Sequence, residues 1–144
     1  MLCRVELIST GTRRAVAFLK FDGNKHVNII EKFSGLKDSA KFNFQSRFDS
    51  WIDGIEHRSW YHGWSSKDHG GIYKGCFQFR YIDDRIYGLL CHPVSRPSFQ
   101  LCVLTTIVKK NQWKTDTIHL DRIVAISQDA QVSAAIRRLH IKEA

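Results

Sequence analysis

The sequence has little of what would indicate a second domain, a membrane span or a secretion signal. It contains only two prolines, both in the segment 93–97, and it has no internal repeat or low-complexity tract. The longest apolar run, 101–108, is too short to span a membrane and includes two threonines. Residues 1–6 lack the basic stretch and apolar run of a secretory peptide. We therefore expect one cytoplasmic domain over residues 1–144, with no membrane association.

Metal-binding and cofactor motifs are absent as well. The four cysteines, Cys3, Cys76, Cys91 and Cys102, have no CxxC spacing, and together with His92 they match no standard zinc pattern. The adjacent residues Cys91 and His92 would also point to opposite faces of a strand. Signatures of P-loop, dinucleotide-binding, nucleophile-elbow and zinc-protease sites are missing. We expect reduced thiols, no metal and no cofactor.

The charge balance is strongly basic. Lys and Arg number 22 against 14 Asp and Glu, which gives a net charge of +8 and a pI near 9.5. An excess of this size favours a polyanionic partner, of which nucleic acid is the commonest, although a passive basic surface is the alternative. The 43% of hydrophobic residues is typical of a globular protein that buries its own core.

The N-terminal half mixes strand and helix patterns. Residues 4–9 alternate as a strand does, whereas 13–21 fit a strand or a helix equally well. Residues 27–36 repeat apolar side chains every three positions. Residues 44–55 carry the clearest amphipathic helical pattern, which stops at Asp53-Gly54. Both stripes predict helices with buried core faces.

A long segment rich in aromatic residues, about 56–75, follows these helices. Trp60, Tyr61 and Trp64 have two interpretations: they stack on unpaired bases, or they seal an edge of the core. The second is favoured because large aromatic side chains are usually buried. The histidines of this segment and of the next strand have no partner at a diagnostic spacing: His57, His62, His69 and His92.

The C-terminal half predicts three consecutive strands and a helical end. Residues 76–82 and 85–92 flank a turn at Asp83-Asp84 and should form a hairpin. Residues 99–108 predict a central strand covered on both faces, and 120–139 predict helix. The expected fold is α+β: a small twisted antiparallel sheet, N-terminal helices packed on one face and a C-terminal helix, with the helices on one side of the sheet.

Two arginines of the predicted hairpin should lie together. Strand alternation turns Arg80 away from the apolar set Phe77, Phe79 and Tyr81, and Arg85 follows directly after the turn. Like charges on neighbouring strands repel unless an anion joins them, and a guanidinium binds phosphate oxygens in a bidentate manner. The pair therefore indicates a phosphate site.

Lys109 and Lys110 close the third strand of this group. Depending on the strand register, they reach the end of the sheet that carries the arginines or the opposite end. The alternative is that they are only a solvated strand end, since lysine is mostly exposed in any protein.

The stretch 74–140 resembles the RelE- and HigB-type toxins in their phage-derived branch. Gly75 precedes an apolar strand that ends at Arg80, and Arg85 opens the next strand after the hairpin turn. A further apolar strand ends in Lys109-Lys110. Trp113-Lys114-Thr115 and the C-terminal helix also fit the pattern.

The resemblance implies a RelE-like domain that acts as the toxin of a type II toxin–antitoxin system. Such a protein is a ribosome-dependent, metal-independent endoribonuclease that cuts mRNA on the ribosome through the 2′-hydroxyl of the substrate, and a cognate antitoxin covers its basic site. By this analogy Arg80 and Arg85 hold the phosphate, while Lys109 or Lys110 binds RNA or transfers a proton. The implied RNA-binding set is Lys74, Arg80, Arg85, Lys109, Lys110 and Lys114. The alternative is a non-catalytic phage or mobile-element protein of the same fold that binds nucleic acid or a host protein.

Overall fold

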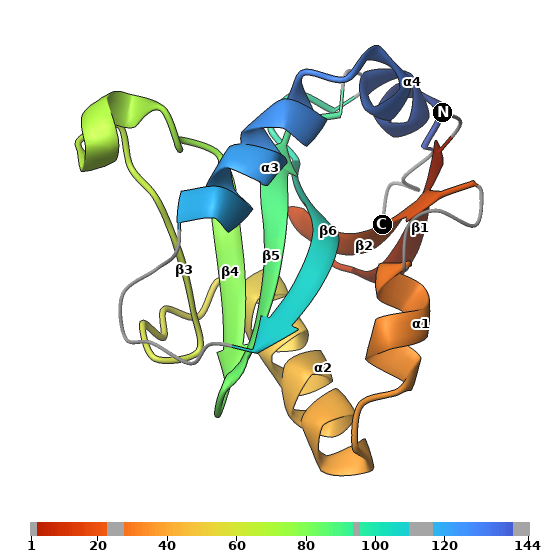
Figure 1. Ribbon diagram of the computed structural model, residues 1–144, viewed down its shortest axis with the longest axis vertical. Coiled ribbons are helices and arrows are strands. Elements are labelled where there is room, and N and C mark those ends of the chain that lie inside the picture. The colour runs from red at the N-terminus through yellow and green to blue at the C-terminus, as the bar shows by residue number, and fades with distance from the viewer. Residues whose placement is uncertain (1–2, 23–27, 94–95, 110–116, 140–144) are drawn as a thin grey trace.

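A mixed β-sheet lies between two layers of helices in the computed structural model, which describes residues 3–22, 28–93, 96–109 and 117–139 (Figure 1). The strand order is β1-β2-β6-β5-β4-β3, and β2–β6 is the parallel pair. The strands are β1 (Cys3–Thr10), β2 (Arg14–Phe21), β3 (Tyr61–Gly63), β4 (Cys76–Tyr81), β5 (Asp84–Cys91) and β6 (Gln100–Lys109). The helices are α1 (Ile29–Ser34), α2 (Asp38–Ile52), α3 (Thr117–Ser127) and α4 (Ala130–Arg138), with a 3-10 turn, η1, at Asp68–Gly71.

The α+β class is confirmed, but the expectation of a small antiparallel sheet is wrong. The ambiguous stretch 13–21 forms a strand, β2, which pairs with β1 as a hairpin and lies parallel to β6. The short strand β3 extends the other edge from within the aromatic segment. The three predicted consecutive strands β4, β5 and β6 are antiparallel neighbours, as expected. The sheet therefore has six strands and mixed pairing.

Helices cover both faces of this sheet, not one side as the sequence predicted (Figure 1). α1 and α2 pack on one face, where aromatic side chains from α2 dominate the core: Phe44, Phe48 and Trp51. α3 and α4 pack on the other face through Leu120, Ile123, Val132 and Ala135. The central strand β6 supplies both cores, because Leu101 and Val103 enter the second core while Cys102 and Leu104 enter the first. Within the described part of the chain, no helix combines the length and the apolar character needed to cross a bilayer.

A β-bulge interrupts the pairing of β5 with β6. Tyr87 lies opposite Thr106 and Gly88 lies opposite Leu104, so Thr105 is the extra residue of β6. The Thr105 hydroxyl donates to the Tyr87 carbonyl oxygen at 3.2 Å. A Cβ atom on Gly88 would come within 2.6 Å of the Val103 carbonyl oxygen, so this close approach of the two strands requires glycine.

The bulge reverses the side-chain alternation along the last part of β6. Before the bulge the even-numbered Leu104 enters the core under α1 and α2; after it the odd-numbered Ile107 does. Lys109 therefore lies opposite Asp84 on the α1–α2 face, whereas Val108 lies opposite Arg85 on the α3–α4 face.

The β4–β5 hairpin has a strained tip. Its two-residue loop is Ile82-Asp83, one position earlier than the predicted Asp83-Asp84, because Tyr81 and Asp84 form the last strand pair. Ile82 has a φ of +52°, a left-handed conformation that is rare for a β-branched residue and that two-residue hairpin loops usually give to glycine or asparagine. The Ile82 side chain is 72% exposed, so no core packing compensates for this conformation.

We predict that Ile82→Asn stabilises the protein. Asparagine tolerates the left-handed region, and strain of this kind costs on the order of 1–3 kcal/mol. The free energy of unfolding in urea should rise by about 1 kcal/mol. Phe42→Asn is the matched control, because Phe42 is also 72% exposed but lies in α2; it should change stability by less than about 0.5 kcal/mol. A loss of stability in Ile82→Asn would contradict the assignment of strain.

Candidate nucleic-acid interface

Arg80 and Arg85 are direct cross-strand neighbours near the tip of the β4–β5 hairpin. Their proximity was predicted from strand alternation and is confirmed by the register. Both side chains are half-buried on the α3–α4 face of the sheet. Burial, and then the charge of Arg85, lower the pKa of the Arg80 guanidinium below its usual value. Since arginine stays protonated in proteins, the site keeps two neighbouring positive charges.

Neutral acceptors hold these two guanidinium groups in place. Arg85 Nη1 donates to the carbonyl oxygens of Ile82 at 2.7 Å and Asp84 at 3.0 Å. Arg85 Nε is buried without a hydrogen-bond partner. The ion pairs found in the described ranges, Arg4–Glu6 and Lys41–Asp38, involve neither arginine of this pair. The backbone therefore orients Arg85 without neutralising its charge.

A buried glutamine links the arginine pair to the edge strand β3. The Gln78 side chain is fully buried, and its Oε1 accepts from Arg80 Nε at 2.7 Å and from His62 Nε2 at 2.7 Å. This amide orientation is assigned from the neighbouring groups. In the opposite orientation the Gln78 NH2 group would face the N–H donors of Arg80 and His62. The His62 ring lies 4.6 Å from the Trp64 ring, centroid to centroid. Three adjacent strands thus contribute polar or aromatic groups to one face.

Tyr87 and His119 complete this face, and the sequence analysis did not identify either. Tyr87 lies opposite Gln78 on β5, and its ring stacks on His119 of α3 with centroids 5.4 Å apart. Strand alternation puts Tyr87 on the same face as Arg85, so that signal was present in the sequence. His62 and His119 come from β3 and α3, and only the tertiary fold brings them to the arginines.

The two predicted lysines that the structure describes, Lys74 and Lys109, do not join the arginine pair. Lys109 is at the same end of the sheet but on the opposite face, where it lines a groove of about 450 Å³ with Lys37 and Asp83. The β-bulge causes this separation, because it reverses the side-chain alternation before Lys109. Lys74 is exposed in the turn before β4, at the strand end far from Arg80. Lys110 and Lys114 lie outside the described residues.

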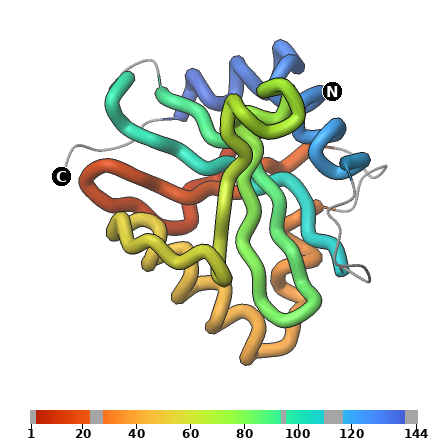
Figure 2. The backbone as a smooth tube through the Cα atoms, turned by 90° about the vertical axis from the view of Figure 1, so that its left-hand side faces the viewer, coloured from red at the N-terminus to blue at the C-terminus, as the bar shows by residue number. Residues whose placement is uncertain are grey.

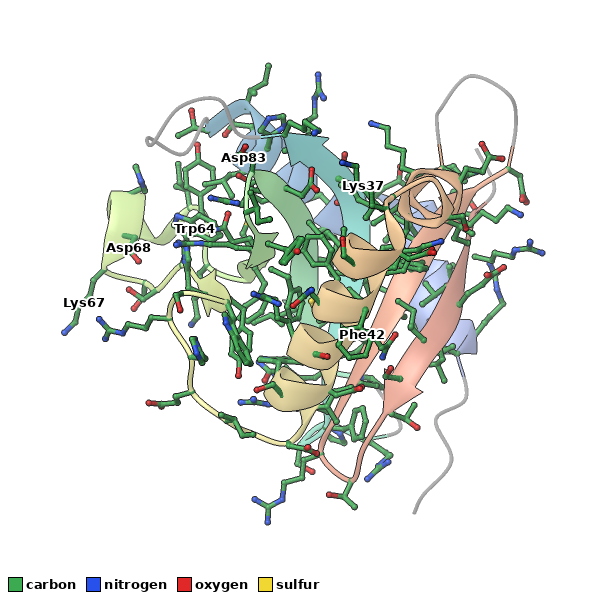
Figure 3. All side chains as sticks on the ribbon, turned by 90° about the horizontal axis from the view of Figure 1, so that it is seen from below. Lys37, Phe42, Trp64, Lys67, Asp68 and Asp83 are labelled. Carbon is green, nitrogen blue, oxygen red and sulfur yellow. The ribbon has the colours of Figure 1, made fainter. Side chains whose placement is uncertain are left out.

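The aromatic segment packs against the two cores. Tyr61 is buried, and its hydroxyl donates to the Ile55 carbonyl oxygen. Trp60 packs on the α1–α2 core and Trp64 on the α3–α4 core. Trp60 also stacks on the His57 ring, with centroids 3.9 Å apart. The interpretation in which these rings seal the core edge agrees with this packing. Figure 3 shows Trp64 near the segment that carries Lys67 and Asp68.

The four cysteine thiols are divided between the two cores of the sheet. Cys102 faces the α1–α2 core, while Cys76 and Cys91 face the α3–α4 core. In the part of the chain that the structure describes, no three His, Cys, Asp or Glu side chains gather as a ligand set. Burial raises the pKa of the Cys76 thiol to about 11 and that of Cys91 to about 12, so both thiols are protonated near neutral pH.

We predict that the Cys91 thiol makes the protein less stable in alkaline solution. Between pH 9.0 and about pH 12 the thiol ionises in the unfolded chain but stays protonated in the folded chain. Each pH unit in this window should lower the free energy of unfolding by about 1 kcal/mol. In Cys91→Ala, urea unfolding should therefore depend less steeply on pH above 9.0. Parallel pH profiles for the two proteins would rule out this contribution.

Comparisons with protein-family models, with curated proteins and with solved structures find no match. The resemblance to RelE- and HigB-type toxins thus depends on the motifs of residues 74–140. The geometry on which a function can be argued is the α3–α4 face of β3, β4 and β5, with its arginine pair and its buried glutamine.

Proposed function

We propose that this protein binds RNA through the Arg80–Arg85 pair and cleaves it as a metal-independent endoribonuclease toxin. One observation carries the proposal: the two arginines lie side by side, oriented by neutral acceptors, and no carboxylate of the described residues pairs with them. Adjacent guanidinium groups with no carboxylate partner among the described residues favour a ligand with several anionic oxygens. The net charge of +8 supports a polyanion as that ligand.

The surrounding groups favour RNA as the polyanion and support a role in strand cleavage. A phosphate on the arginine pair would lie near the imidazole of His62, a group that transfers protons in phosphoryl chemistry, whereas Tyr87 is buried beneath this face. The attacking 2′-hydroxyl comes from the RNA, so the protein needs to stabilise charge and move protons. The resemblance to RelE- and HigB-type toxins adds mRNA on the ribosome as the substrate and an antitoxin as the partner.

The second candidate is a non-catalytic protein that binds RNA, DNA or a host protein on the same face. The position of Lys109 favours it, because the proposed proton-transfer lysine lies across the sheet from the arginines. His62 Nε2 donates to the buried Gln78, and a hydrogen bond of this kind also serves a purely structural role. In this candidate the arginine pair binds phosphates without supporting cleavage.

We predict that RNA binding depends on the arginine pair more than on net charge. Arg80→Gln/Arg85→Gln should weaken binding of single-stranded RNA at least about tenfold and lower the slope of log affinity against log salt by roughly 1–2. The control is Arg137→Gln/Arg138→Gln, which removes the same charge from exposed positions at the end of α4. Affinity is measured by fluorescence anisotropy. If both double variants lose RNA affinity equally, binding depends on net positive charge and not on the Arg80–Arg85 site.

Controlled expression in a bacterium separates the two candidates. For the toxin we expect growth arrest and new mRNA 5′ ends inside open reading frames, and we expect Arg80→Gln/Arg85→Gln to abolish both. The control variant at Arg137 and Arg138 should remain toxic. RNA binding in vitro together with unchanged growth and transcripts would favour the non-catalytic candidate.

A further inference from the structure

The tip of the β4–β5 hairpin has two features that do not stabilise the fold. Ile82 has a left-handed backbone, and its side chain is 72% exposed. A glycine or an asparagine at this loop position would avoid both. The hairpin also extends beyond the neighbouring strands, as Figures 1 and 2 show. Strained residues that the fold does not require are found mainly where a ligand is bound.

The tip is directly connected to the arginine pair. The Ile82 carbonyl oxygen accepts a hydrogen bond of 2.7 Å from Arg85 Nη1. The left-handed turn therefore holds an exposed apolar side chain and a guanidinium group in one small unit. A nucleotide presents the matching combination, because its charged phosphate and its largely apolar base face are joined through one ribose.

The carboxylates of the hairpin end do not share the face of the arginines. Asp84 lies opposite Lys109 in the strand register, on the α1–α2 face. Asp83 lines the groove that also contains Lys37 and Lys109; Ile82, at the turn between the two faces, borders this groove as well and stays 72% exposed. Repulsion between a bound phosphate and these carboxylates is thus reduced by the sheet and by the two lysines.

We propose that Ile82 is an apolar wedge that contacts, and unstacks, the base next to the phosphate held by Arg80 and Arg85. The proposal rests on the proposed RNA-binding function and adds a contact to the base. Aliphatic side chains act in this way in nucleic-acid complexes, where they insert at a base step and separate neighbouring bases. An exposed isoleucine on a projecting turn has the shape for such insertion.

The test uses oligoadenylate RNAs in which 2-aminopurine replaces single adenines, with 2′-O-methyl riboses so that the strand is not cleaved. Stacking quenches 2-aminopurine, so wild-type protein should raise its fluorescence at one position of the bound strand. Ile82→Asn should abolish this rise and weaken binding roughly five- to tenfold, with the salt slope unchanged because no charge is removed. Ile82→Leu should retain the fluorescence rise.

The control variant again is Phe42→Asn, since Phe42 is equally exposed but lies on α2, away from the hairpin tip (Figure 3). It should bind and unstack the RNA as wild type does. Ile82→Asn is expected to be more stable than wild type, so its loss of unstacking would not result from unfolding. The fluorescence rise should also disappear in Arg80→Gln/Arg85→Gln, because the strand is then no longer held beside the tip.

Failure of the Ile82 wedge and failure of the proposed RNA binding give different results. Wild-type affinity and fluorescence in Ile82→Asn, with binding still dependent on Arg80 and Arg85, would overturn the wedge and leave the RNA site intact. If Arg80→Gln/Arg85→Gln binds RNA as tightly as wild type, or if wild type does not bind RNA, the proposed function is wrong and so is the wedge. If Ile82→Asn loses a protein partner but no RNA contact, the tip is a protein-docking residue and the wedge is wrong.

Discussion

The close approach of β5 to β6 at Gly88 determines how charge is distributed at one end of the sheet. Because a Cβ atom there would meet the Val103 carbonyl oxygen at 2.6 Å, glycine allows the strands to accommodate the bulge at Thr105. The bulge turns Lys109 to the α1–α2 face and leaves Arg85 on the other. Without it, strict alternation would put Lys109 on the same face as the arginine pair, where a third cation would increase the repulsion.

Two other half-buried arginines, Arg14 and Arg47, have different surroundings. Arg14 donates to the Trp51 carbonyl oxygen at 2.7 Å and lies over the Trp51 ring, and Arg47 lies over Trp60 and Tyr81. These cations contribute to packing through cation–π contacts. Arg80 and Arg85 instead lie next to each other, and like charges directly opposite across strands destabilise a sheet. The different environments separate structural arginines from a pair whose repulsion an anion would relieve.

Local patterns in the sequence were enough to predict the strands β4, β5 and β6, the core stripe of α2 and the pairing of Arg80 with Arg85. They were insufficient where a long-range contact decides the outcome. Residues 13–21 fit two structures, and pairing with both β1 and β6 selects the strand. The second helical layer, the bulge and the approach of His62 to Gln78 involve segments distant in sequence, so no spacing along the chain reports them.

Several departures from local preference meet at one end of the sheet, although others lie elsewhere, such as the positive φ of His69 and the buried, unpaired Arg47 Nε. The left-handed Ile82, the cross-strand arginines, the buried unpaired Arg85 Nε and the reversed alternation before Lys109 all occur at the end of the sheet formed by the β4–β5 hairpin and the last part of β6. The core residues of β6 that precede the bulge, by contrast, alternate regularly between two apolar cores. Sequences usually satisfy local rules except where function requires otherwise. Since several of these departures lie around one pair of positive charges, a polyanion bound there would offset part of the repulsion between Arg80 and Arg85.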